Sequence, residues 1–143
     1  QNLTWWGGPQ SVFIEKAFKK EPIDIHGDGS QTRTFTFVDD TVSALVLCVE
    51  NEKSNNEIYN TGGKSGGEIS IKELAILIWK LVNGKDAEPQ LNFIPYSTFG
   101  KYEDVMRRVP DISKISSQLG YVPEWDLEKG LKVTIEWQKE FII

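Results

Sequence analysis

The spacing of apolar residues along the chain predicts a mixture of helices and short strands. Apolar positions three and four residues apart, separated by charged positions, are typical of helices that cover a core with one face. This pattern predicts helices over residues 11–20, 40–50, 71–82, 112–119 and from about residue 126 onward. The helix over residues 40–50 is apolar on nearly every side. We therefore expect it to be buried on more than one face.

Alternation of apolar and polar residues predicts strands between these helices. Residues 23–26 alternate strictly and lead into a glycine-rich turn, after which the alternation resumes in residues 34–38. Further strand candidates lie at residues 57–60 and 91–94. The mixture of helices and short strands predicts the α/β class, in the α+β form expected of a fragment.

Polar residues mark where several of these helices begin and end. Asp39 or Asp40 is predicted to cap the second helix, and Asp111 to cap the fourth, because a carboxylate accepts hydrogen bonds from free backbone N–H groups. Ser70 and Glu73 have the spacing of a capping box at the start of the third helix.

Length, charge and cysteine content exclude several classes of protein. The 143 residues suffice for one domain with a core, and the net charge of -5 argues against broad binding to nucleic acid or to an anionic membrane. No apolar run reaches the ~20 residues of a membrane span. The single cysteine, Cys48, lies in an apolar run and is expected to be buried. One cysteine cannot form a disulfide within the chain, which fits a cytoplasmic protein. Because the chain begins at Gln1, we expect it to be a piece of a longer protein.

Gly27-Asp28-Gly29-Ser30 forms a turn that ends close to Arg33. Glycine adopts positive φ at little steric cost and lets a ligand approach the backbone. Arg33 follows where the turn becomes a strand, and its planar guanidinium suits bidentate contact with a phosphate or carboxylate. On the turn alone, an ordinary β-hairpin with a surface arginine is the simpler interpretation.

The complete string over residues 27–40, GDGSQTRTFTFVDD, is more specific. It resembles the segment G-x-G-x-Q-x-R-x-F-x-[YF]-V-x-D of the extended short-chain dehydrogenases, the NAD-dependent epimerase/dehydratase family that acts on nucleotide sugars. Segments at residues 57–62, 69–75, 107–112 and 119–137 resemble the same family in the same order. The resemblance implies that residues 1–143 form the C-terminal, substrate-binding lobe of a Rossmann-type enzyme, with helices packed on short strands.

The same resemblance implies roles for individual residues. It places a contact to the substrate's diphosphate on Arg33 and a second one on either Arg107 or Arg108. Gly27 and Gln31 belong to the same substrate-binding string. His26 either lines the nucleotide base or is an ordinary strand residue. As the one histidine of the sequence, it also excludes a histidine-rich metal site.

Two motifs that the family needs for catalysis are absent from the sequence. Neither the cofactor loop G-x-x-G-x-x-G nor the catalytic Tyr-x-x-x-Lys occurs in it. The loop at residues 62–67, GGKSGG, lacks the first glycine of a phosphate-binding P-loop, since Ile58 stands there. The resemblance implies that NAD binds to an upstream domain of the parent enzyme. We therefore expect neither a bound cofactor nor catalysis in this chain by itself.

Three functions remain open on the sequence. The first is the substrate-binding part of an epimerase, dehydratase, decarboxylase or reductase that acts on a UDP- or dTDP-sugar, with a homodimeric parent. The second is a stand-alone, non-catalytic module that binds a nucleotide sugar. The third is an α+β scaffold whose arginines are merely solvated.

Overall fold

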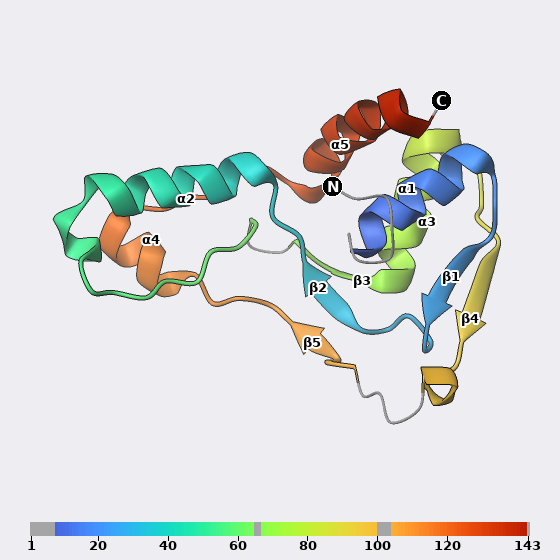
Figure 1. Cartoon of the computed structure of the whole chain (residues 1–143), viewed down its shortest axis with the longest axis horizontal. Helices are drawn as coiled ribbons and strands as arrows, with labels where there is room; N and C mark the ends of the chain where they lie inside the picture. Colours follow the sequence, from blue (N-terminus) through green and yellow to red (C-terminus); the bar gives the residue numbers. More distant parts are fainter. Residues whose placement is uncertain (1–7, 65–66, 100–103, 143) are drawn as a thin grey trace. The chain divides into compact units, whose positions relative to one another are not determined.

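The computed structural model describes residues 8–64, 67–99 and 104–142 (Figure 1). The chain divides into two compact units. Unit 1 comprises Gln1–Thr32, Ile69–Arg107 and Leu131–Ile143, and unit 2 comprises Arg33–Glu68 and Arg108–Gly130. Each unit has buried apolar residues of its own, and the two are described separately.

Unit 1 consists of helices packed beside a small parallel sheet (Figure 1). Helix α1 (Pro9–Lys19) packs against α3 (Ile71–Asn83), next to strands β1 (Ile23–His26) and β4 (Leu91–Ile94). The two strands pair in parallel, with Ile23 opposite Leu91 and His26 opposite Ile94. Both were predicted from the sequence with these bounds. The core of this unit is formed by Phe13, Ile14, Ala17, Ile23, Ile25, Ile71, Leu74, Ala75, Ile78, Trp79, Leu131 and Ile135.

The capping box at the start of α3 is confirmed. The hydroxyl of Ser70 accepts a hydrogen bond from the backbone N–H of Glu73 at 3.1 Å, and the Glu73 carboxylate accepts one from the backbone N–H of Ser70 at 3.1 Å. The helix ends at Gly84, whose N–H donates to the carbonyl of Lys80. Local sequence signals therefore define both ends of this helix.

Unit 2 is built around helix α2 (Val38–Glu50) and the shorter helix α4 (Ser113–Leu119) (Figure 1). A short 3-10 helix, η2 (Glu52–Ser54), follows α2. The buried cluster of this unit consists of Ala44, Ile115, Leu119 and Tyr121. Leu47 and Cys48 are partly buried against it, so Cys48 lies at the margin of the core.

The prediction that α2 is buried on more than one face is wrong for the described part of the chain. Its buried residues are Asp40 and Ala44. Apolar side chains at helical spacing are exposed along it, namely Val38, Val42, Leu45, Val46 and Val49. The sequence pattern thus identified an apolar surface correctly, but only one side of the helix packs against residues of this chain.

The predicted aspartate caps lie close to the helix starts but not at the N-cap. Helix α2 begins after Phe37, which places Asp39 and Asp40 in its first turn. Helix α4 begins after Ile112, and the Asp111 carboxylate still accepts from the N–H of Ser113 at 2.9 Å. A carboxylate one position before the cap can therefore satisfy the same free amides.

The predicted strand over residues 34–38 is too long, and the predicted strand over residues 57–60 is wrong. Strands β3 (Glu68–Ser70), β2 (Thr32–Thr34) and β5 (Arg107–Arg108) form a sheet in the order β3-β2-β5. The alternating run over residues 34–38 is a strand only at its first residue, because α2 begins at Val38. Residues 57–60 are not assigned as a strand. A strand requires backbone pairing with a neighbour, which an alternating sequence alone does not supply.

Candidate anion-binding site

The glycine-rich turn after β1 is held by the N-terminus of α3. The carbonyl of Gly29 accepts a hydrogen bond from the N–H of Lys72 at 3.0 Å, and the carbonyl of Gln31 accepts one from Ile71 at 3.0 Å. The first amides of a helix have no partner within the helix, so the turn satisfies them. The turn is thereby fixed immediately before Arg33.

Both glycines of this turn are required by its geometry. Gly27 has a φ of 68° and Gly29 a φ of 76°, in the left-handed region. A β-carbon at Gly27 would lie 2.4 Å from the ring of Tyr96. One at Gly29 would lie 2.8 Å from the side chain of Ile25. Any other residue would therefore be strained and would also force neighbouring atoms apart.

The buried side chain of Gln31 stabilises the turn. Its Nε2 donates to the carbonyl of His26 at 3.0 Å. The Oε1 of Gln31 has no hydrogen-bond partner within the residues that the structure describes. The half-buried imidazole of His26 has a pKa lowered by burial, an effect that the negative charges of Asp24 and Asp104 oppose. His26 is therefore mainly neutral at neutral pH.

The arginines lie on neighbouring strands. Arg33 is half-buried on β2, the middle strand of its sheet, while Arg107 and Arg108 are exposed on β5. Unit 2 contains Arg33 and Arg108, and unit 1 contains Arg107 together with the turn. The structure thus gathers His26, Gly27 and Gln31 within unit 1, and places Arg33 and Arg108 on adjacent strands in unit 2.

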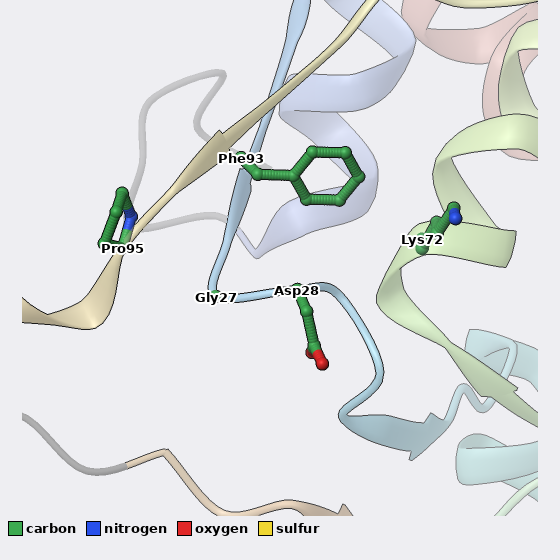
Figure 2. A pocket seen from close by; sticks show the side chains of 5 residues that line it. All are labelled: Gly27, Asp28, Lys72, Phe93 and Pro95. Carbon is green, nitrogen blue, oxygen red and sulfur yellow. The ribbon is translucent and has the colours of Figure 1, made fainter.

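An open hollow of about 500 Å³ lies beside the turn in unit 1 and was not predicted (Figure 2). It is lined by Gly27, Asp28, Lys72, Phe93 and Pro95. Figure 2 shows the ring of Phe93 extending from β4 towards Lys72 on α3, and the Lys72 ammonium is 5.9 Å from the ring centroid. The turn after β1, the end of β4 and the start of α3 supply this lining. Each strand was predictable, but their parallel register was not.

The Asp28 side chain is occupied within the turn. Its Oδ1 accepts from the backbone N–H of Ser30 at 2.9 Å and from the Ser30 hydroxyl at 2.6 Å. These hydrogen bonds lower the pKa of the Asp28 carboxyl, and the charge of Lys72 lowers it slightly further. Asp28 therefore carries a negative charge at neutral pH, and this charge would repel an anion placed next to it.

Gly62 and Gly63 do not present the open backbone of a phosphate-binding P-loop. The faces of Gly62 and Gly63, which a P-loop would turn towards a phosphate, are covered by Pro110 and by the carbonyl of Phe35. Within residues 8–64, 67–99 and 104–142, no cluster of His, Cys, Asp or Glu could hold a metal. None of the helices in the same ranges has the length and apolar character needed to cross a membrane.

Solved structures of nucleotide-sugar enzymes share this fold. UDP-glucuronic acid 4-epimerase from Bacillus cereus, in complex with UDP-glucuronic acid and NAD, matches 94% of this chain with a TM-score of 0.81 and 28% identity. UDP-glucose 4-epimerase from Thermotoga maritima, with UDP-glucose, matches 95% with a TM-score of 0.77 and 30% identity. The chain covers 40% of each of these two structures. The predicted α/β class and the Rossmann-type family fold are thereby confirmed.

Sequence comparison defines the family. The sequence profile of the family described as GDP-mannose 4,6 dehydratase matches residues 11–134. The chain is 35% identical over 128 residues to UDP-N-acetyl-alpha-D-glucosaminuronate decarboxylase of Bacillus cytotoxicus, covering 90% of the chain and 39% of that enzyme. It is 35% identical over 130 residues to UDP-glucuronate 4-epimerase of Thermodesulfobacterium geofontis, covering 91% and 37%. The chain belongs to this family of extended short-chain dehydrogenases, and it spans about 40% of the length of such relatives.

Proposed function

We propose that this chain is the substrate-binding part of an NAD-dependent enzyme that acts on a UDP- or dTDP-sugar. Arg33 and one arginine of β5 hold the diphosphate, His26 lines the nucleotide base, and Gly27 and Gln31 belong to the same substrate-binding segment. The diphosphate contacts position the sugar without reacting with it. Binding free energy from this remote part of the substrate then orients the carbon that reacts.

The placement of Arg33 carries the proposal. It stands on the middle strand of its sheet, directly after a turn that α3 holds in place, and the neighbouring strand is Arg107–Arg108. A guanidinium on a rigid strand loses little conformational entropy when it binds an anion, and each charge-assisted hydrogen bond contributes about 1.5–3 kcal/mol. Two arginine-bearing strands side by side provide such donors against a net charge of -5.

We further propose that a dinucleotide-binding domain precedes this chain in the complete protein. The motifs for NAD binding and for a catalytic tyrosine do not occur in this sequence, whereas the similar B. cereus enzyme was solved with NAD. The exposed apolar residues of α2 and the exposed Ile58 supply a surface for that domain to cover. The cytoplasmic location and the homodimer expected from the sequence and the resemblance stay predictions.

The exposed face of α2 also distinguishes between the proposed enzyme part and the alternative, a stand-alone module that binds a nucleotide sugar. A self-sufficient nucleotide-sugar-binding module would have to cover Val42, Leu45 and Val49, which are at least half exposed here. This observation favours the enzyme part over the module.

Steady-state kinetics on the full-length protein test the proposal. The protein is assayed with UDP-glucuronate, UDP-glucose and dTDP-glucose, and Arg33→Ala is compared with the original on the best substrate. We expect turnover that depends on NAD and an Arg33→Ala variant with a raised KM and a lowered kcat. Unchanged kinetic constants would refute the role of Arg33, and a full-length protein without an NAD-binding domain would refute the enzyme assignment.

A further inference from the structure

The backbone of Gly63 lies against the segment that carries Arg33. A β-carbon at Gly63 would be 2.4 Å from the backbone carbonyl oxygen of Phe35, two residues after Arg33. That oxygen cannot move aside as the end of a flexible side chain can. Gly63 is buried, and its φ is not in the left-handed region. The glycine is therefore needed for close approach and not for its backbone conformation.

The preceding glycine lies in the same way against the segment that carries Arg108. A β-carbon at Gly62 would be 2.5 Å from Cγ of Pro110, two residues after Arg108, and 3.1 Å from Cγ2 of Ile112. The rigid ring of Pro110 limits how far this contact can relax. Gly62 thus lies against the segment that follows Arg108, and Gly63 lies against the segment that follows Arg33; all of these residues belong to unit 2.

A buried tyrosine holds the backbone of this glycine pair in place through a hydrogen bond. The hydroxyl of Tyr121 donates to the carbonyl of Gly62 at 2.8 Å, and the Tyr121 side chain is only 1% exposed. Burial, together with the charge of Asp40, raises the pKa of the phenol, which therefore remains a donor at neutral pH. The glycine backbone is consequently held from a third side.

We propose that Gly62, Gly63 and Tyr121 form a spacer that sets the separation between Arg33 and Arg108. They are positioning residues, and they act on the substrate only through the two guanidiniums. This inference rests on the proposed function, since it concerns the same diphosphate. Bidentate contacts tolerate little displacement, so a shift of about 1 Å between the arginines weakens binding strongly.

Calorimetric titration of the full-length protein with UDP tests the spacer. Gly62→Ala pushes against Pro110, and we expect it to weaken UDP binding about tenfold. Adding Pro110→Ala removes the clashing Cγ and should restore most of the lost affinity. Uridine, which has no phosphates, should bind Gly62→Ala and the original protein equally well.

Gly120→Ala is the matched control. Gly120 lies in the same unit with a φ of 74°, and a β-carbon added there would meet no heavy atom within 4 Å. The substitution strains the backbone without touching the spacer, so it should lower the melting temperature and leave the UDP affinity unchanged. If Gly120→Ala weakens UDP binding as much as Gly62→Ala does, a general loss of stability is responsible and the spacer is refuted.

Two further variants separate failure of the spacer from failure of the proposed function. If Arg33→Ala and Arg108→Ala weaken UDP binding but Gly62→Ala does not, the spacer is refuted and the proposed function stands. If neither arginine variant weakens UDP binding, the proposed function fails, and the spacer with it. Should Gly62→Ala not fold, Tyr121→Phe removes one hydrogen bond only. It should weaken UDP binding by about threefold and leave uridine binding unchanged, whereas equal losses for both ligands would refute the spacer.

Discussion

At the scale of single residues, the pKa of His26 reflects the environment next to the glycine-rich turn. It is half-buried at the end of β1, with Asp24 and Asp104 as the charges that act on it. Burial disfavours the charged imidazolium, and the two carboxylates only partly offset this effect. The sequence placed this residue before the turn correctly, but its neighbour Asp104 comes from a distant loop that no local pattern connects to it.

We predict that His26 titrates below its ordinary pKa of 6.5. Because it is the one histidine of the sequence, its Hε1 proton gives the one histidine signal of that kind to follow in a proton NMR titration. Because the folded pKa is lowered, the unfolded state binds more protons between the two pKa values. The stabilising contribution of His26 is therefore complete above pH 6.5 and is lost as the pH falls through the folded value.

Asp24→Asn removes one of the charges that raise this pKa, so the midpoint should move further down in that variant. Asp39→Asn, which changes a carboxylate that does not influence His26, is the control and should leave the midpoint where it is. A midpoint at or above 6.5 in the unchanged chain would contradict the prediction.

At the scale of elements, Asp40 in the first turn of α2 binds the backbone of the segment that precedes α5 (Leu127–Ile142). One carboxylate oxygen accepts from the N–H of Glu124 at 2.8 Å, and the other accepts from the N–H of Trp125 at 3.2 Å. Asp40 is 3% exposed. Without it, both amides would lose their charged acceptor in a partly buried place.

We predict that Asp40→Ala lowers the free energy of unfolding by about 3 kcal/mol, because two charge-assisted hydrogen bonds are lost. Asp39→Ala alters the neighbouring, exposed carboxylate of the same helical turn and should cost about 0.5 kcal/mol or less. Urea unfolding followed by circular dichroism measures both values. Similar losses for the two variants would show that Asp40 acts only through the helix dipole.

Helix ends marked by local signals and the strands β1 and β4 were predictable, whereas the pairing of the strands was not. Ser70 and Glu73 specify the start of α3 through their own hydrogen bonds, so the sequence alone identified it. Residues 57–60 have the alternation of a strand but do not form one, because alternation does not provide a neighbouring strand to pair with. The same limit applies to the site: Arg33 follows from its motif, whereas the spacer depends on Gly62 meeting Pro110 far along the chain.

At the scale of the whole molecule, the exposed face of α2 is the surface that we propose a preceding domain covers in the complete protein. Val42, Leu45 and Val49 are 50%, 59% and 86% exposed, and Ile58 is 86% exposed. Contiguous apolar surfaces of this kind usually mark an interface. The sequence predicted the apolar character of the helix, but it could not predict which side the rest of the chain would leave uncovered.

We predict that the 143-residue chain by itself associates or binds a hydrophobic dye through this face, and that Val42→Lys reduces both effects. Val122→Lys, at an exposed valine of the same unit outside α2, should leave them unchanged. Sedimentation velocity and dye fluorescence measure the two effects. A monomeric chain without dye binding would contradict the prediction and would favour the stand-alone module.

The most direct test of the central claim is the contribution of the diphosphate to binding. Calorimetry measures the affinities of UDP and uridine for the full-length protein and for Arg33→Ala, at low and at high salt. We predict that UDP binds the original protein much more tightly than uridine, that salt reduces this difference, and that Arg33→Ala weakens UDP by about tenfold or more while leaving uridine unchanged. If UDP binds Arg33→Ala as tightly as it binds the original protein, Arg33 does not hold the diphosphate and the account is wrong.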